Sequence, residues 1–301
     1  IEKRLFSHDV TSQEFMDVFS FKGVEFGNWV KQGAGGRERQ GMLNDAYDAF
    51  MDLAGILNIP PKALSLEGKL GIGFGSRGSG KASAHYEPDL VVINMTKTKG
   101  AGTLAHEWFH ALDNYFARRR AEQPGSGIAM TDRETAYITY RPERLWVNKK
   151  HPSMRMTRSE LSRYQANHPN APLYAEGNWE PDQNHPKGVR PQVEKAFAEL
   201  VATLNASPML QRAKVIDGKT SDGYWSRIIE RGARSFETYV IARLADQGFR
   251  NDYLANVQTL EQFSRDPGRY PYLTPDEQGP VNEAFDKLFA TLETKETDQG
   301  V

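Results

Sequence analysis

The fold of this chain is decided by residues 102–115, which read GTLAHEWFHALDNY. Neither proline nor glycine occurs between Thr103 and Gln123, and apolar side chains recur at three- and four-residue steps. This pattern predicts a helix with one buried face and with Thr103 as its N-cap. Upstream, the apolar run Leu90–Met95 predicts a buried strand, closed by a glycine-rich turn. We therefore expect a strand that leads into a long helix.

Two histidines lie four residues apart on this predicted helix, His106 and His110, and Glu107 follows the first. Residues at this spacing share a helix face and lie about 6 Å apart along the axis, so both imidazoles can reach one metal ion. The pattern is typical of a catalytic zinc site, in which the protein ligands leave one position open for water. Glu107 can take the proton of that water, so the segment predicts hydrolysis. The alternative is a pair of histidines with ordinary hydrogen-bond partners on an amphipathic helix.

A single-zinc site of this kind needs a third protein ligand, and a glutamate on a later helix is one common source. The periodic segment Tyr224–Ala245 predicts such a helix, and it carries both Glu230 and Glu237. The two glutamates are seven positions apart, which places them on nearly the same face, so the spacing leaves both open. Asp113 lies three residues after His110, where its carboxylate is predicted to accept an imidazole N–H.

Composition narrows the class of protein. The 301 residues are 39% hydrophobic, which is enough for a sizeable core. The 38 basic residues nearly balance the 39 acidic ones, so the net charge does not indicate nucleic acid or a membrane as a partner. The absence of cysteine excludes disulfides and thiolate ligands, leaves His, Asp or Glu to hold zinc, and favours the cytoplasm. No apolar run is long enough to span a membrane, and the first residues lack a signal-peptide core. A start without Met suggests that the sequence was cut from a longer protein.

The order of predicted elements indicates an α+β fold in a single domain over residues 1–301. A helix over 37–58 precedes strands over 70–74, 84–86 and 90–95, and the helix with the two histidines follows. Further helices are expected at Pro191–Leu204, Tyr224–Ala245 and Val281–Thr294.

A proline-rich region follows the histidine helix. Eight of the 16 prolines fall between Pro124 and Pro191, and periodicity is weak there. We expect residues 118–222 to form a large, partly ordered insertion within the domain.

Residues 75–82, GSRGSGKA, resemble a phosphate-binding loop but lack the Ser or Thr that should follow the lysine. A strand is predicted after this loop, whereas a phosphate-binding loop opens a helix, so we reject nucleotide binding. His85 lies on that strand, which we expect at the sheet edge where an extended substrate would pair.

Residues 102–115 resemble the signature of zincin-type metallopeptidases that use glutamate as the third zinc ligand. Three further stretches resemble the zincin-like domains of large polyvalent proteins from phages and conjugative elements: FKGVEFGNWV at 21–30, FGSRG at 74–78 and AHYEP at 84–88. The resemblance covers about residues 21–255.

The resemblance also implies site residues. In related zincins the third ligand opens a Glu-x-x-Ala-(Glu/Arg)-x-Phe pattern, and ERGARSF at 230–236 matches it, which favours Glu230 and leaves Glu237 in reserve. Some of these enzymes stabilise the oxyanion with a tyrosine about two turns before the glutamate, which implies Tyr224 here, with His85 as the other candidate. The separation of His110 from Glu230 is longer than these families usually show.

The implied function is that of a zinc-dependent endopeptidase, encoded on a mobile element, that cleaves a protein or peptide of the host or of the element. One alternative is a zincin-like domain without turnover that binds a partner and counters host defence. Another is a DNA-associated anti-restriction protein, for which Arg118–Arg120 and the basic residues between Lys149 and Arg163 are the support.

Overall fold

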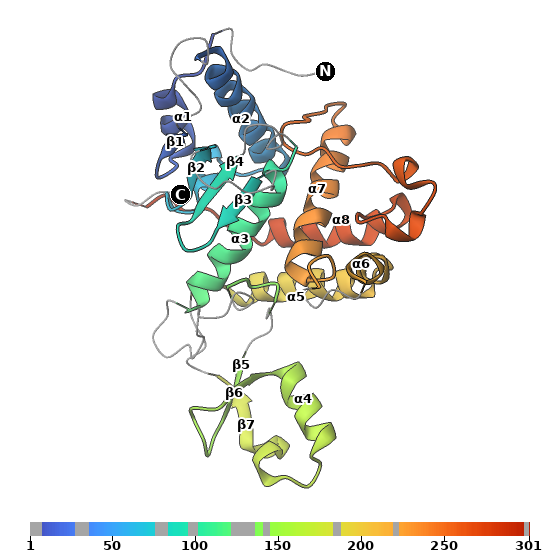
Figure 1. Ribbon diagram of the computed structural model, residues 1–301. Helices are drawn as coiled ribbons and strands as arrows, with labels where there is room; N and C mark the ends of the chain where they lie inside the picture. Colours follow the sequence, from blue (N-terminus) through green and yellow to red (C-terminus); the bar gives the residue numbers. More distant parts are fainter. Residues whose placement is uncertain are drawn as a thin grey trace. The chain divides into compact units, whose positions relative to one another are not determined.

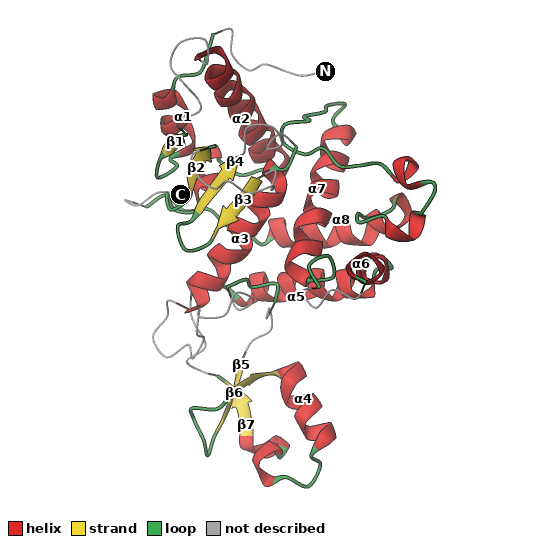
Figure 2. Ribbon diagram, in the orientation of Figure 1, coloured by secondary structure: helices red, strands yellow, loops and turns green. Residues whose placement is uncertain are grey.

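The structure is a computed structural model, which describes residues 8–27, 36–75, 84–95, 102–121, 136–140, 145–182, 188–218, 223–297 and 301. Helices and small sheets alternate along the chain, which confirms the predicted α+β class (Figures 1 and 2). The chain divides into two compact units, a larger one of Ile1–Leu112 with Thr203–Val301 and a smaller one of Asp113–Ala202. Among the described residues, no helix is long and apolar enough to cross a membrane.

The larger unit contains a four-stranded sheet with the order β1-β2-β4-β3. Its strands are β1 (Val24–Phe26), β2 (Gly71–Phe74), β3 (Ala84–Glu87) and β4 (Val92–Met95), as Figure 2 shows. β1, β2 and β4 run parallel, while β3 pairs antiparallel with β4 and forms the edge. The three strands predicted from the sequence are confirmed, and His85 lies on the edge strand as expected.

The helices follow the predicted periodic segments in most places. In the larger unit they are α1 (Ser12–Phe19), α2 (Gly36–Leu57), α6 (Met209–Asp217), α7 (Ile228–Asp246) and α8 (Pro275–Ala290), with short 3₁₀ helices at Pro61–Ser65, Leu260–Phe263 and Pro267–Arg269. α3 (Leu104–Ala121) and α5 (Pro191–Ala206) begin in one unit and end in the other.

The prediction of a helix from Tyr224 was wrong at its start. α7 begins at Ile228, and Tyr224 lies in a turn that precedes it. The cause is the carboxylate of Asp217, which accepts hydrogen bonds from the backbone N–H groups of Trp225 and Ser226 at 2.7 and 2.8 Å. Because these two N–H groups bind a side chain, residues 225–226 form a turn and the helix begins after them.

The prediction for the last helix was also wrong at its start. α8 begins at Pro275, six residues before the predicted start at Val281, and contains Pro280 within it. Thr274 precedes the helix, and its backbone N–H donates to the carboxylate of Glu277 at 2.9 Å. This capping box starts the helix earlier than the apolar periodicity indicated.

Aromatic side chains join α3 to α7 and α8 within the larger unit. The ring of Phe236 on α7 lies 5.9 Å from Trp108 and 5.1 Å from Phe109, both on α3. Phe285 on α8 completes the group, with its ring 5.7 Å from Phe109 and 5.5 Å from Phe236. All four side chains are fully buried, so they fix the position of one helix against the next.

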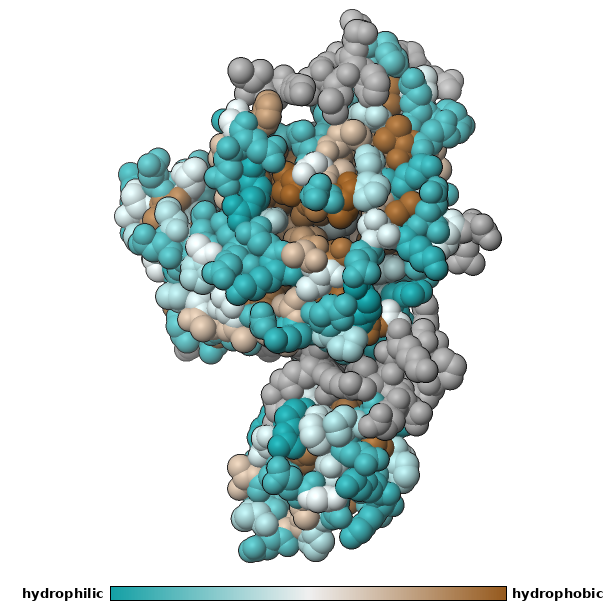
Figure 3. All heavy atoms as spheres, turned by 180° about the vertical axis from the view of Figure 1, so that it is seen from behind, coloured by the Kyte–Doolittle hydropathy of each residue, from teal (hydrophilic) through white to brown (hydrophobic). Residues whose placement is uncertain are grey.

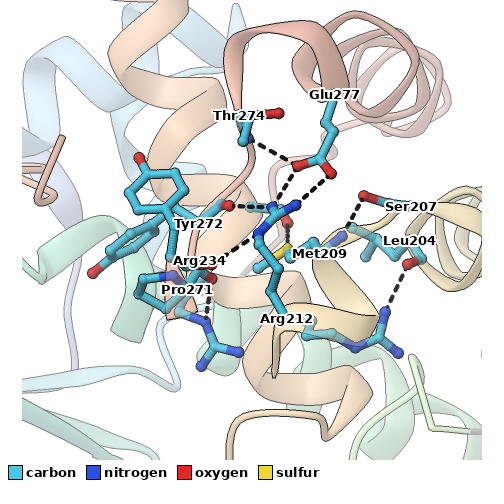
Figure 4. A network of polar contacts seen from close by, with 12 residues as sticks. Leu204, Ser207, Met209, Arg212, Arg234, Pro271, Tyr272, Thr274 and Glu277 are labelled. Atoms are coloured by element: carbon cyan, nitrogen blue, oxygen red, sulfur yellow. Dashed lines mark hydrogen bonds and ion pairs between the residues drawn. The ribbon is translucent and has the colours of Figure 1, made fainter. Parts of the chain in front are cut away.

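An arginine joins α6 to the segment that leads into α8 (Figure 4). Arg212 donates two hydrogen bonds to the carboxylate of Glu277, at 2.8 and 2.6 Å. It also donates to the carbonyls of Tyr270 and Tyr272. All three nitrogens of this guanidinium donate hydrogen bonds. Arg212 therefore ties α6 to the segment before α8 within the larger unit.

The contacts of Arg212 lie within the larger unit. We expected an insertion over 118–222, and the smaller compact unit spans Asp113–Ala202. α6 follows the end of this smaller unit, and its side chains Met209 and Ala213 are buried. The residues after Ala202 therefore belong to the larger unit.

The smaller unit has a sheet of its own. Three antiparallel strands are in the order β6-β5-β7. They are β5 (Leu145–Asn148), β6 (Arg155–Thr157) and β7 (Trp179–Pro181), accompanied by α4 (Arg158–Asn167) and 3₁₀ helices at Pro172–Tyr174 and Glu176–Asn178. The region read as an insertion thus folds around strands that its weak periodicity did not predict.

The rejected phosphate-binding loop lies mostly outside the described residues, because 76–83 are not among them. The strand β3 follows it, and not a helix, as expected. On the face of the larger unit drawn in Figure 3, hydrophilic residues surround a hollow in which hydrophobic residues are visible.

Candidate metal centre

α3 brings His106 and His110 together. The helix starts at Leu104, so both histidines lie in its first two turns, and their ring centroids are 4.7 Å apart. The two Nε2 atoms are 3.1 Å apart. Little of either side chain is exposed, 13% for His106 and 8% for His110. One turn of helix is therefore enough to aim both Nε2 atoms at one place.

α7 brings Glu230 to the same place, although more than a hundred residues separate it from the histidines. Its Oε2 atom lies 3.5 Å from Nε2 of His106 and 3.7 Å from Nε2 of His110. The two helices approach closely because Gly232 faces Phe109, and a Cβ atom at Gly232 would lie 3.1 Å from that ring. The missing side chain thus lets the carboxylate reach the imidazoles.

The spacing of these three atoms fits a metal ion. Ligand atoms at about 2.0–2.1 Å from a tetrahedral zinc ion lie about 3.3–3.4 Å from one another. The separations here are 3.1, 3.5 and 3.7 Å. Oε2 of Glu230 is also buried, and within the described part of the chain no hydrogen-bond donor reaches it. A buried carboxylate oxygen of this kind needs a cation as partner.

Glu237 lies on the other side of His106. Its Oε2 atom is 3.1 Å from Nδ1 of His106, and only 3% of its side chain is exposed. When Nδ1–H donates to this carboxylate, the lone pair of His106 is on Nε2 and faces His110 and Glu230. The two glutamates that the spacing left open therefore contact different nitrogens of one ring.

The charges of the site favour a cation at its centre. Burial favours the neutral ring of His106, but the carboxylates of Glu237, Glu230 and Glu107 outweigh it and raise the pKa of His106 to about 10. Burial likewise opposes ionisation of Glu230, but the imidazoles of His110 and His106 hold the pKa of Glu230 well below its usual range. The cluster thus stabilises positive charge between the three ligand atoms, whether from protons or from a metal ion.

Glu107 borders this centre from the first turn of α3. It is 7% exposed, and its negative charge contributes to the raised pKa values of His106 and Tyr224. A buried carboxylate thus lies close to one imidazole of the site and to a phenol.

Tyr224 approaches the centre from the turn before α7. Burial of its hydroxyl, followed by the charge of Glu230 and a hydrogen bond to that carboxylate, raises the pKa of Tyr224 above its usual range. The residue as a whole is 42% exposed, so its ring borders solvent while its hydroxyl faces Glu230. A phenol that stays protonated can donate a hydrogen bond.

The structure gives two other predicted residues different partners. Nε2 of His85 lies 3.1 Å from Oε1 of Glu87 on the same strand. The carboxylate of Asp113 accepts the backbone N–H of Thr139 at 2.9 Å. Nδ1 of His106, one imidazole nitrogen of the site, lies 3.1 Å from Oε2 of Glu237.

Sequence reasoning treated Glu237 as a reserve ligand and did not assign it to Nδ1 of His106. It also did not single out Arg234, which lies one helical turn after Glu230 and close enough to lower the pKa of Tyr224. The sequence feature that could have indicated both roles is the set of charged residues on an otherwise apolar helix, because charged residues are seldom buried without a partner.

One family matches part of the chain. Residues 216–296 match the large polyvalent protein-associated domain 1. The matched segment includes Glu230 and Glu237 on α7, and all of α8, whereas His106 and His110 precede it. The expected link to large polyvalent proteins is therefore supported over this segment.

No curated protein and no solved structure matches the chain.

Proposed function

We propose that this chain is a zinc-dependent endopeptidase in which His106, His110 and Glu230 hold the ion. The observation that carries the proposal is the set of three ligand-atom separations, 3.1, 3.5 and 3.7 Å, on a buried site built from two helices. A zinc ion held there supplies Lewis-acid activation of water and of a peptide carbonyl.

Glu107 is the proposed general base. Its carboxylate takes a proton from the attacking water and delivers it to the nitrogen of the leaving amine. The residue follows the first histidine directly and is 7% exposed, so its carboxylate is held close to the ligands and is largely shielded from solvent.

Tyr224 is the proposed donor to the oxyanion. Its hydroxyl faces Glu230, and a phenol is protonated at neutral pH, so it can donate a hydrogen bond to developing negative charge. His85 stays the second candidate for this role, since its strand β3 forms the sheet edge along which an extended peptide would pair.

Replacing Glu107 by Gln tests the mechanism. We expect the variant to bind zinc as the unchanged protein does and to lose peptide cleavage by at least about 10²-fold, because an amide cannot accept the proton. Glu283→Gln is the matched control, since Glu283 is an exposed residue of α8 that contacts Lys287. Elemental analysis and cleavage of a peptide library are the measurements. Full activity in Glu107→Gln contradicts the mechanism.

The same experiment separates the alternative of a binding domain without turnover. Bound zinc together with no cleavage by the unchanged protein favours that alternative. Of the basic residues behind the DNA-associated alternative, Arg155 and Arg158 contact Asp182 and Glu176 at 2.8 and 3.2 Å. Salt-dependent binding of DNA in a mobility assay tests that alternative.

The family match over residues 216–296 supports a place in a large polyvalent protein. We propose that the substrate is a protein of the mobile element or of its host and that cleavage takes place in the cytoplasm, where a chain without cysteine needs no oxidising conditions.

A further inference from the structure

The turn at residues 223–227, which leads into α7, is held by buried charged side chains. Asp217, the last residue of α6, is 7% exposed. Its two carboxylate oxygens accept the backbone N–H groups of Trp225 and Ser226, at 2.7 and 2.8 Å. Gly223 begins the turn with a φ of +54°, and the hydroxyl of Ser226 donates to its carbonyl at 3.2 Å.

Two arginines on α7 hold the carbonyls of the same dipeptide. Arg231 donates from Nε to the carbonyl of Ser226 at 3.1 Å. Arg234 donates from Nη2 to the carbonyl of Trp225, and its guanidinium lies 4.9 Å from the centre of the Trp225 ring. The dipeptide thus has both N–H groups and both carbonyls bound by charged side chains.

The arginines are anchored elsewhere as well. Arg231 donates to the carbonyl of Leu204 at 2.7 Å and to the side chain of Asn205 at 2.6 Å. Arg234 donates to the carbonyl of Pro271 at 3.2 Å, as Figure 4 shows. These additional hydrogen bonds hold both guanidinium groups in place independently of the turn.

Holding these charges away from water costs free energy. Arg231 and Arg234 are only 3% and 2% exposed. A short turn closes without such groups, since backbone hydrogen bonds and a glycine are enough. The free energy spent on burying these charges next to the candidate metal centre indicates that this turn must be rigid.

The residue that this turn carries toward the centre is Tyr224. It immediately precedes the clamped pair Trp225 and Ser226, and its hydroxyl faces Glu230. Glu230 lies on α7 together with Arg231 and Arg234, so one helix carries both the candidate ligand and two of the three groups that hold the turn.

We propose that Asp217, Arg231 and Arg234 are positioning residues that hold Tyr224 in place as the hydrogen-bond donor to the oxyanion. The proposal rests on the peptidase function proposed above. A donor fixed in advance needs no reorganisation when charge develops on the substrate oxygen, so the clamp acts on kcat through Tyr224.

Asp217→Asn tests the clamp with little change of shape. The amide keeps one acceptor oxygen, but its NH₂ group faces a backbone N–H, which loosens the turn. We expect kcat to fall at least about tenfold while KM and zinc content stay unchanged, because the lost interaction acts only in the transition state. Asp182→Asn is the matched control, since Asp182 is a buried acceptor for Arg155 in the smaller unit.

A double-mutant cycle separates positioning from stability. In a Tyr224→Phe background, Asp217→Asn is expected to change kcat by less than about twofold, because the group that the clamp holds is already gone. If Asp217→Asn lowers kcat by the same factor with and without the Tyr224 hydroxyl, the clamp does not act through Tyr224 and the proposal is overturned. Arg231→Lys is a second variant for the same cycle, because a lysine cannot replace the forked donor.

Amide hydrogen exchange tests the clamp without any cleavage assay. We expect slow exchange at Trp225 and Ser226 that quickens by more than about tenfold in Asp217→Asn. Equal exchange rates in the two proteins overturn the clamp. If exchange quickens but the unchanged protein cleaves no peptide, the holding of the turn stands and the peptidase function fails.

Discussion

At the scale of single residues, His106 is the centre of the site. Its Nε2 atom faces Oε2 of Glu230 at 3.5 Å, and its Nδ1 atom faces Oε2 of Glu237 at 3.1 Å. The two glutamates are two turns apart on one helix, so α7 determines both the candidate ligand and the tautomer of the neighbouring imidazole.

We predict that Glu237→Gln weakens zinc binding about 10- to 100-fold, because the amide accepts the Nδ1–H without a negative charge to strengthen the imidazole as a ligand. Competition with a chelator measures the affinity. The exposed Glu283→Gln serves as the control for loss of one charge. Unchanged affinity in Glu237→Gln contradicts the role that we give to this carboxylate.

At the scale of elements, the approach of α7 to α3 depends on one position without a side chain. A Cβ atom at Gly232 would lie 3.1 Å from the ring of Phe109. That ring cannot yield easily, because it is fully buried against Phe236 and Phe285.

We predict that Gly232→Ala lowers the free energy of unfolding by about 1 kcal/mol and weakens zinc binding, because the overpacking outweighs the gain in helix propensity. Gly55→Ala is the matched control, since Gly55 lies in α2 with no atom within 4 Å of an added Cβ. There the propensity alone acts, and we expect a gain of about 0.5–1 kcal/mol. Chemical denaturation measures both, and a stabilised Gly232→Ala protein refutes the packing argument.

The attachment of α6 to α8 is predicted to depend on pH. Burial opposes ionisation of Glu277, but its hydrogen bonds to Arg212, together with the N–H of Thr274, lower its pKa below the ordinary 4.5. A lowered pKa in the folded state contributes stability that is present above pH 4.5 and is lost as the pH falls through the folded value.

We therefore expect Glu277→Gln to cost about 2 kcal/mol of unfolding free energy at pH 7, and progressively less as the pH falls below about 4.5. Denaturant titrations of both proteins at several pH values measure the difference. If the difference in unfolding free energy between the two proteins stays constant down to pH 3, the charge of Glu277 does not contribute to stability.

At the scale of the whole molecule, the candidate ligands come from two helices that lie far apart in sequence but within the larger unit. An ion that binds only the folded form stabilises it, by about 4 kcal/mol when its free concentration is a thousand times the Kd. We predict that zinc raises the Tm of the larger unit and that a chelator reverses this. Calorimetry of the unchanged protein and of Glu230→Ala, with and without zinc, is the measurement. A zinc-dependent shift of the same size in Glu230→Ala excludes this site as its source.

The sequence by itself determined what depends on neighbours along the chain. The spacing of His106 and His110, the strand before them and the α+β order follow from periodicity over a few residues. The start of α7 did not follow from periodicity, because Asp217 binds the backbone of residues 225–226 and replaces the first turn of the expected helix.

Only the tertiary structure decided the rest. Glu230 and Glu237 are equivalent by spacing, and their distances from the two nitrogens of His106 depend on how α7 packs against α3, through Gly232 and the aromatic core. The strands of the smaller unit were missed as well, because each is short and is stabilised by pairing with strands elsewhere in the chain. Interactions between distant segments leave no periodic trace in the sequence, so the ring of charges around the candidate metal centre became visible only when the helices were packed.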